Sequence, residues 1–405
     1  MTGLLHRLGI MTGAKMEMIE MMLSEAVQDG IVNHGNWIRM KQCLDKAAAG
    51  EPVTVGFLGG SITQDAGASV HENCYAYRVY QWWKKNFPQS EISYVNAGIG
   101  ATTSHFGVAR VQSDLLYAKP DFVVVEFSVN DNDIDGIDET DFFRETYEGL
   151  VRRIFGADFE PAVLLVHNVR YNDGSSAEDF HVEIGKAYDL PSVSMRKTVY
   201  PLVEDGRVKA SDISGDNLHP NDLGHKVLAE LITSFLEKVR AEQETAAADG
   251  SHVMLSEKTV TENSYENAVR LQNGIDGYAS SNWKADGFVA DGAKQEALRD
   301  IFKGGWTASK VGDSIVFEVT GCNIAAQYRK SVKQPTPIAK VIVDGDEEHG
   351  VLLDGNFDQD WGDKLQLDKV FHHGKGGQHR VEVRIVQASE EDQAPFYLTS
   401  LIVAG

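Results

Sequence analysis

The chain has 405 residues, more than one ordinary hydrophobic core accommodates, so two domains are expected. Its hydrophobic content of 42% and its charged content of 24% are typical of a folded globular protein. A formal net charge of −22 argues against partners such as nucleic acid, polyanionic substrates or anionic membrane surfaces, and leaves neutral ligands unaffected.

The cysteines and the first residues of the chain bear on where the protein acts. Cys43, Cys74 and Cys322 are odd in number, and their spacing matches neither a disulfide framework nor a zinc motif. The N-terminal stretch MTGLLHRLGIMTGAKMEMIEMM has only a short apolar patch, and no apolar run in the sequence is long enough for a membrane span. A cytoplasmic protein is therefore expected.

Residues 53–240 alternate apolar runs with amphipathic stretches. Four short apolar runs are expected to be buried strands, at 53–58, 92–98, 121–129 and 161–168. Apolar residues recur at helical spacing in DFFRETYEGLVRRIF and in NDLGHKVLAELITSFLEKVR. This alternation is typical of a doubly wound α/β domain with a mostly parallel sheet.

The composition changes after residue 240. Residues 243–252 are small and polar and are expected to link a first domain, 1–242, to a second, 253–405. Beyond this linker, four runs have an apolar period of two and are separated by turns rich in Gly and Asp, at 314–319, 339–345, 380–386 and 396–405. This pattern predicts an antiparallel β-sandwich resembling a jelly roll.

The stretch VTVGFLGGSITQDAG, residues 53–67, places a serine directly after two glycines at the end of a strand. Gly59 and Gly60 end the strand and leave Ser61 at the sheet edge where open α/β sheets bind ligands. Considered alone, Ser61 could be a helix N-cap, part of a phosphate-binding loop or a nucleophile. An N-cap is the commonest role for a serine before a helix.

Three further segments favour the nucleophile. NAGIGATTSHFGVAR contains Gly100, EFSVNDND contains Asn130, and SGDNLHPNDLGH contains Asp216 and His219 just before a helix. Acyl transfer needs a nucleophile, a base, a group that orients the base, and donors for the oxyanion. His219 can be the base that takes the proton of Ser61, and Asp216 can orient the His219 ring. The oxyanion donors can be the Ser61 N–H, an N–H near Gly100 and the Asn130 amide.

These four segments resemble the blocks of the SGNH (GDSL-type) hydrolase superfamily, which carry Ser, Gly, Asn and His in this order. The first block reads GGSIT instead of G-D-S, the third reads SVND, and the last, DNLHP, keeps the D-x-x-H-P motif. The resemblance implies a triad of Ser61, Asp216 and His219, with the asparagine of the third block as an oxyanion donor. Many members have glycine where this chain has Ala101, so the backbone donor is the N–H of Gly100 or of Ala101.

The C-terminal region resembles the β-sandwiches that follow such domains in bacterial polysaccharide deacetylases, and the whole architecture resembles carbohydrate esterase family 17. Members of that family remove acetyl groups from β-mannan oligosaccharides inside the cell. The resemblance implies a serine esterase without a cofactor, acting on O-acetyl groups of a neutral plant oligosaccharide, mannan-type first and xylan next. Trp306 and Trp361 are candidates for stacking on sugar rings, although a sandwich core also needs large residues.

Two other functions remain open. One is a lysophospholipase or thioesterase acting on acyl esters, and the other is a glycan-binding protein whose hydrolase domain is inactive.

The sequence contains no phosphate loop, no G-x-S-x-G elbow and no complete dinucleotide fingerprint. It also contains no H-E-x-x-H motif, and no metal site is predicted.

Overall fold

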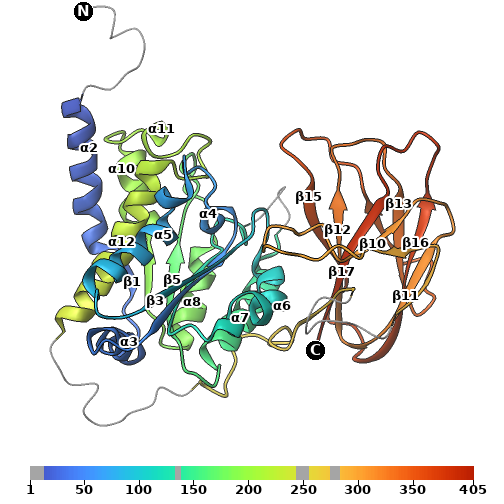
Figure 1. The fold of residues 1–405 in the computed structure, drawn as a ribbon, viewed down its shortest axis with the longest axis horizontal. Coiled ribbons are helices and arrows are strands. Elements are labelled where there is room, and N and C mark those ends of the chain that lie inside the picture. Colours follow the sequence, from blue (N-terminus) through green and yellow to red (C-terminus); the bar gives the residue numbers. More distant parts are fainter. Residues whose placement is uncertain (1–12, 133–137, 243–254, 274–282) are drawn as a thin grey trace, which may run out of the picture. The chain divides into compact units, whose positions relative to one another are not determined.

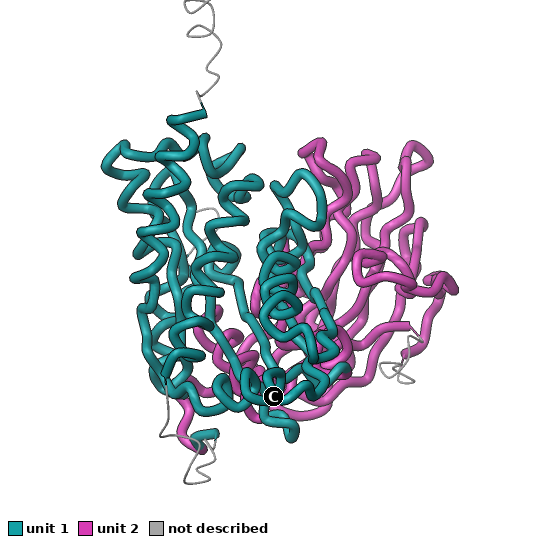
Figure 2. The backbone as a smooth tube through the Cα atoms, turned by 60° about the vertical axis from the view of Figure 1, so that its left-hand side comes forward, with its two compact units in different colours: residues 1–100, 118–140, 157–256 teal, residues 101–117, 141–156, 257–405 magenta. Residues whose placement is uncertain are grey.

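The computed structural model describes residues 13–132, 138–242, 255–273 and 283–405. Contacts between Cα atoms divide the chain into two compact units, shown in Figure 2. The first unit comprises 1–100, 118–140 and 157–256, and the second comprises 101–117, 141–156 and 257–405. The predicted linker lies outside the described residues, so the sequence-based domain boundaries stay a prediction.

The first unit contains an α/β sheet with helices around it (Figure 1). This sheet has six strands in the order β1-β6-β5-β4-β2-β3. All neighbouring strands from β3 to β6 are parallel, and β1 is antiparallel to β6. The strands are β1 (Ile31–Asn33), β2 (Val53–Gly59), β3 (Ile92–Gly98), β4 (Phe122–Glu126), β5 (Ala162–His167) and β6 (Ser192–Ser194). The helices are α2 (Gly13–Ala26), α3 (Ile38–Ala48), α4 (Ser61–Gln64), α5 (Tyr75–Asn86), α8 (Glu178–Ala187), α9 (Met195–Thr198), α10 (Tyr200–Glu204), α11 (Ala210–Ile213) and α12 (Asp222–Ala241).

Continuous burial of the central strands explains why apolar and polar residues do not alternate in their sequences. Every residue of β4 and β5 is buried, and β2 has a single partly exposed residue. Helix α12 buries Val227, Leu231, Phe235 and Val239 along one stripe, as its spacing predicts. The prediction of a mostly parallel α/β sheet is confirmed. Within the described ranges, none of the helices combines the length and the apolarity that crossing a bilayer requires.

The strand order fixes where a ligand site belongs. In chain order the five parallel strands follow the 2-1-3-4-5 arrangement of doubly wound sheets, because β3 lies on one side of β2 and β4 on the other. The connections leaving β2 and β4 therefore run in opposite directions. Ligands bind at this switch point, outside the carboxyl ends of the two strands.

The second unit contains two antiparallel sheets that pack face to face. One sheet has the order β15-β12-β17-β10-β9 with β7 beside β17, and the other has the order β14-β13-β16-β11-β8. Its strands are β7 (Val269–Leu271), β8 (Trp283–Asp286), β9 (Val289–Ala290), β10 (Trp306–Ala308), β11 (Ser314–Gly321), β12 (Asn323–Lys330), β13 (Ile338–Val343), β14 (Val351–Asp354), β15 (Lys364–Phe371), β16 (Gly377–Gln387) and β17 (Phe396–Ala404). The predicted β-sandwich is confirmed.

Two helices from the α/β part of the sequence group with the sandwich in the second unit. They are α6 (Ser104–Asp114) and α7 (Thr140–Phe155), the latter from residue 141 onward. The guanidinium carbon of Arg270 lies 4.9 Å from the ring centroid of Phe106 on α6. Arg270 also donates to the hydroxyl of Ser400 on β17 at 3.3 Å. This contact helps to bury both faces of β17, which has no exposed residue.

The sandwich core corrects one prediction. The side chain of Trp306 is 0% exposed, and its ring makes edge contacts with Phe317 at 5.4 Å and with Trp283 at 5.6 Å. A ring enclosed between two sheets cannot stack on a sugar, so Trp306 is a core residue. Trp361 is 56% exposed and packs against Phe357, so it stays a candidate sugar contact.

Candidate active site

The two glycines before Ser61 are required by close packing. A Cβ atom on Gly59 would lie 2.5 Å from the carbonyl oxygen of Glu126 on β4, and one on Gly60 would lie 2.4 Å from Oδ1 of Asn130. Neither position has room for a side chain. Strand β2 can therefore end against β4, and Ser61 becomes the first residue of α4 at the switch point.

Ser61 contacts a histidine from a distant part of the chain. The Oγ atom of Ser61 lies 2.9 Å from Nε2 of His219, although the two residues are 158 positions apart. On the other side of the ring, Nδ1 of His219 lies 2.6 Å from Oδ2 of Asp216. The carboxylate accepts the Nδ1 proton, which leaves Nε2 as the acceptor that faces the Ser61 hydroxyl.

The loop that carries Asp216 and His219 is braced by its own backbone. Oδ1 of Asp216 accepts the N–H groups of His219 at 2.7 Å and Leu218 at 3.0 Å. Ser214 and Pro220 form a β-bridge across the loop. Asn221 then caps α12, because its side chain accepts from the N–H groups of the second and third residues of the helix. The carboxylate and the imidazole are thus held three residues apart in a fixed geometry.

Hydrogen bonding keeps Asp216 ionised. Burial raises the pKa of this carboxyl, but hydrogen bonds from the His219 ring and from the N–H groups of His219 and Leu218 outweigh it. The net effect lowers the pKa of Asp216 from 3.8 to about 2. The group that orients the imidazole therefore carries its negative charge at every pH above the strongly acidic range.

Asn130 lies beside the serine loop, at the carboxyl end of β4. Its side-chain amide is adjacent to Gly60, and its backbone N–H donates to the carbonyl of Phe127 at 2.9 Å in a tight turn. The neighbouring Asp131 contacts Nε2 of His181 at 3.1 Å, and both side chains are fully buried. Asp131 thus anchors the turn, and the Asn130 amide lies against Gly60, the residue before Ser61.

Gly100 also lies close to Ser61, but its N–H is engaged. A Cβ atom on Gly100 would lie 3.6 Å from Cβ of Ser61, while its N–H donates to Oε1 of Gln64 at 2.5 Å. Sequence reasoning did not identify Gln64 as the partner of this donor. Ala101, the alternative donor, has φ of 55°, a left-handed conformation that glycine adopts more easily. A glycine at position 101 would adopt this conformation without the strain that alanine has there.

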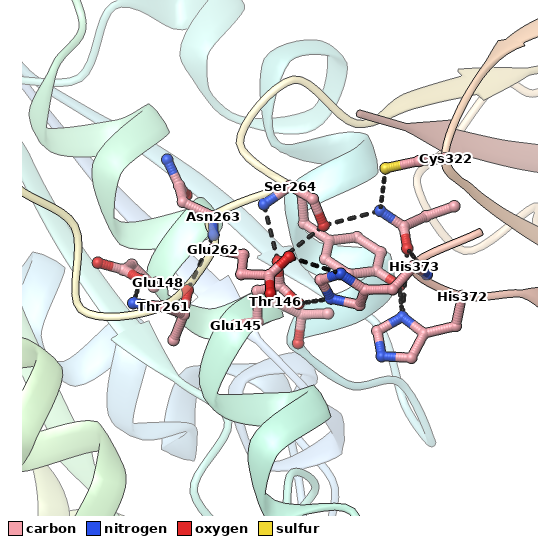
Figure 3. Close-up of polar contacts among 12 residues, drawn as sticks. Glu145, Thr146, Glu148, Thr261, Glu262, Asn263, Ser264, Cys322, His372 and His373 are labelled. Carbon is pink, nitrogen blue, oxygen red and sulfur yellow. Dashed lines mark hydrogen bonds and ion pairs between the residues drawn. The ribbon is translucent and has the colours of Figure 1, made fainter. Parts of the chain in front are cut away.

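The structure also brings together residues that the sequence analysis did not connect. Glu145, His372 and His373 form a cluster in the second unit, shown in Figure 3. The adjacent His372 and His373 were a visible signal in the sequence, but Glu145 gave none. It is one of several polar residues on an amphipathic helix, and only the fold selects it.

A serine, an imidazole and a carboxylate aligned at the switch point of a doubly wound sheet have the arrangement of an α/β serine hydrolase. Comparisons with known proteins agree with this class. Residues 57–227 match the GDSL-like Lipase/Acylhydrolase family.

One solved structure, a two-domain esterase active on acetylated mannans, is 51% identical to this chain. The similarity covers 94% of this chain and 98% of that one, with a TM-score of 0.87. The same esterase co-crystallised with mannopentaose gives a TM-score of 0.86 at the same identity and coverage. Thioesterase 1/protease 1/lysophospholipase L1 of Escherichia coli strain K12 is 26% identical over 154 residues, which is 37% of this chain and 69% of that protein. The chain therefore belongs to the GDSL-like lipase/acylhydrolase family and is a carboxylic ester hydrolase with a C-terminal β-sandwich.

Proposed function

We propose that this esterase removes O-acetyl groups from mannan-type oligosaccharides. The observation that carries the proposal is the 51% identity to a mannan-active esterase, which extends over 94% of the chain and includes the sandwich. A net charge of −22 also suits an uncharged substrate better than an anionic one. The acetylated oligosaccharide is thus the proposed partner of this chain.

In the proposed mechanism, Ser61 is the nucleophile. His219 removes the Ser61 proton as Oγ attacks the acetyl carbonyl, and it then returns this proton to the departing sugar hydroxyl. Asp216 holds the imidazole in the required tautomer and stabilises the positive charge that forms on it. Water, activated by the same imidazole, releases acetate from the acyl-enzyme. The distances of 2.9 Å and 2.6 Å around His219 support these roles.

The tetrahedral intermediate needs hydrogen-bond donors at its oxyanion. As the first residue of α4, Ser61 has an N–H without an acceptor inside the helix, so we propose it as one donor. The Asn130 amide, packed beside Gly60, is proposed as the second. A third comes from Gly100, once Gln64 releases its N–H, or from Ala101.

Asn130→Ala should lower kcat on aryl acetates by about 10²- to 10³-fold, because one oxyanion donor is lost. The KM should change much less, since the amide acts mainly in the transition state. Steady-state kinetics with p-nitrophenyl acetate give both constants. The matched control is Asn73→Ala, which removes an asparagine bonded to Asp222 at 3.0 Å on another loop of the same unit. An Asn130 variant no slower than this control would exclude the proposed donor.

The substrate assignment is tested by acetate release from acetylated manno-, xylo- and pectic oligosaccharides of matched length. We expect the highest kcat/KM on the mannan series, and the position of each removed acetyl can be followed by NMR. Equal rates on all three series, or a preference for pectic fragments, would contradict a mannan-type substrate. The same assay tests Trp361 as a sugar contact. Trp361→Ala should then raise the KM for oligosaccharides and leave the kinetics on aryl acetates unchanged.

A second candidate function rests on the similarity to the E. coli thioesterase and lysophospholipase, which spans 154 residues. The same assay distinguishes it with acyl esters of increasing chain length. Rates that rise from acetyl to palmitoyl esters would favour this alternative, and rates that fall steeply beyond acetyl support the carbohydrate esterase. A cytoplasmic location is proposed as well, since Cys43, Cys74 and Cys322 form no disulfide, and cell fractionation would test it.

A further inference from the structure

A group of metal-ligating side chains lines a cavity in the second unit. The cavity has a volume of about 610 Å³ and is bordered by α7, by the segment around residues 261–264 and by the residues that follow β15. At its wall, one carboxylate oxygen of Glu145 and one ring nitrogen each of His372 and His373 lie within 4.8 Å of one another. These side chains come from two elements far apart in the sequence (Figure 3).

The two carboxylate oxygens of Glu145 have different partners. This side chain is 5% exposed on α7, and its Oε1 accepts the N–H of Ser264 at 2.8 Å and the Ser264 hydroxyl at 2.7 Å. Its Oε2 faces His373, with 2.6 Å between Oε2 and Nε2. Ser264 therefore fixes the orientation of the carboxylate, so that its second oxygen contacts the imidazole of His373.

His373 is oriented in the same way from its other side. Its Nδ1 lies 3.0 Å from Oε2 of Glu262, so this ring nitrogen donates to a carboxylate while Nε2 points to Glu145. Metal-binding histidines typically donate their second ring N–H to a carboxylate or a carbonyl. The arrangement of Glu262 and His373 has this form.

The His372 ring and its supports join the same network. Its Nδ1 lies 2.8 Å from the hydroxyl of Tyr265 and 3.2 Å from Oδ1 of Asn323. Asn323 in turn donates through Nδ2 to the hydroxyl of Ser264 at 2.7 Å, the same hydroxyl that holds Glu145. One hydrogen-bonded set of residues thus positions both His372 and the carboxylate.

A plain ion pair would explain less of this arrangement. Burial lowers the pKa of His373, but the hydrogen bond and the charges of Glu145 and Glu262 raise it more, as expected for an imidazole in an ion pair. Such a salt bridge accounts for His373 and the two glutamates. It does not account for a second imidazole held at the same place, nor for the cavity beside it.

We propose that Glu145, His372 and His373 bind a divalent transition-metal ion through two imidazole nitrogens and one carboxylate oxygen. Zinc is the ion that this ligand set suits, and a fourth position faces the cavity. On binding, the ion takes the place of the direct contact between Nε2 of His373 and Oε2 of Glu145, and it joins α7 to the residues after β15 within the second unit. The ligand is therefore Zn²⁺ rather than Ca²⁺, which prefers six to eight oxygen ligands.

Titration of the metal-free, full-length chain with ZnCl₂ by calorimetry tests this proposal. We expect one equivalent of Zn²⁺ to bind to the wild type, with the affinity reduced at least about 100-fold in His373→Gln and in Glu145→Gln. Zn²⁺ should also raise the Tm of the wild type but not that of the two variants, and Ca²⁺ should raise neither. The amide oxygen of Glu145→Gln can still accept from Ser264, so this variant should fold. Its affinity for Zn²⁺ decides the test if His373→Gln fails to fold.

The matched control is His349→Gln. His349 is an exposed histidine whose Nδ1 lies 2.8 Å from Oδ2 of Asp346, so it is also paired with a carboxylate but is not one of the residues of the proposed site. This variant should bind Zn²⁺ as the wild type does. A wild type without binding below about 100 µM, or folded Glu145 and His373 variants that bind as tightly as the control, would overturn the site.

Discussion

Ser61→Ala is expected to lower kcat on p-nitrophenyl acetate by about 10⁴-fold or more, while the chain stays folded. The physical reason is the loss of the only atom that attacks the ester in the proposed mechanism. The change removes a single oxygen at a position 2.9 Å from Nε2 of His219, so it creates neither a cavity nor a clash. Steady-state kinetics and an equilibrium urea titration measure the two effects on the same preparation.

A matched serine nearby separates the loss of a nucleophile from the loss of any hydroxyl. Ser69→Ala removes a hydroxyl that donates to Asp222 at 2.7 Å, and it should retain most of the wild-type activity. A fluorophosphonate probe should label the wild type and Ser69→Ala but not Ser61→Ala. Labelling of the Ser61 variant, or retention of most of its esterase activity, would refute the assignment. An unlabelled wild type would instead favour a glycan-binding protein with an inactive hydrolase domain.

Asp216→Asn is expected to lower kcat by about 10⁴-fold. The amide oxygen can still accept the backbone N–H groups of His219 and Leu218, so the loop should keep its shape. The amide NH₂ would then face Nδ1 of His219 and place the ring proton on Nε2, where it faces Ser61. An imidazole in that tautomer cannot accept the serine proton. The measurement is kcat on aryl acetates at neutral pH.

The sandwich contains a control with the same local geometry. Asp346 and His349 are also three residues apart, Nδ1 and Oδ2 lie 2.8 Å apart, and the His349 N–H donates to the same aspartate. Asp346→Asn should leave kcat unchanged, because Asp346 and His349 are not part of the proposed triad. If both aspartate variants lose equal activity, the loss reflects stability and the proposed role of Asp216 is wrong.

The lowered pKa of Asp216 also predicts how this substitution affects stability with pH. Since the folded-state pKa of about 2 lies below the ordinary value of 3.8, the ionised carboxylate stabilises the folded state above pH 4. That contribution is lost as the pH falls from about 4 to about 2. Asp216→Asn should thus narrow the difference between urea midpoints at neutral and acidic pH, by a small amount because the side chain is 54% exposed.

Much of the sheet in the first unit could be predicted because its central strands are continuous apolar runs. Every residue of β4 and β5 and all but one of β2 are buried, so the sequence of each strand indicates it without knowledge of its neighbours. Strand β6 was not predicted, because Ser192–Ser194 is short and only its pairing with β5 and β1 defines it. The sequence could also predict that distant segments of the candidate site lie close together, because the carboxyl ends of parallel strands lie at the same edge of a sheet.

Predictions failed where only tertiary packing decides. Nothing in the sequence distinguishes a tryptophan enclosed between sheets from one that faces solvent, so Trp306 and Trp361 gave the same signal. Likewise, the apolar stripe of α7 predicts which residues are buried as a group but not that the carboxylate of Glu145 meets His373. Those two residues are 228 positions apart and come from a helix and a loop.

The braced loop before α12 has a consequence for how substrates can be compared. Asp216, His219 and their backbone partners are ordered when the protein folds, so binding a sugar need not supply the entropy of arranging them. A small acetate ester that touches no glycan subsite should therefore meet Ser61, His219 and Asp216 already in place. When its leaving alcohol is as basic as a sugar hydroxyl, the ratio between its kcat/KM and that of an acetylated oligosaccharide measures recognition of the carbohydrate.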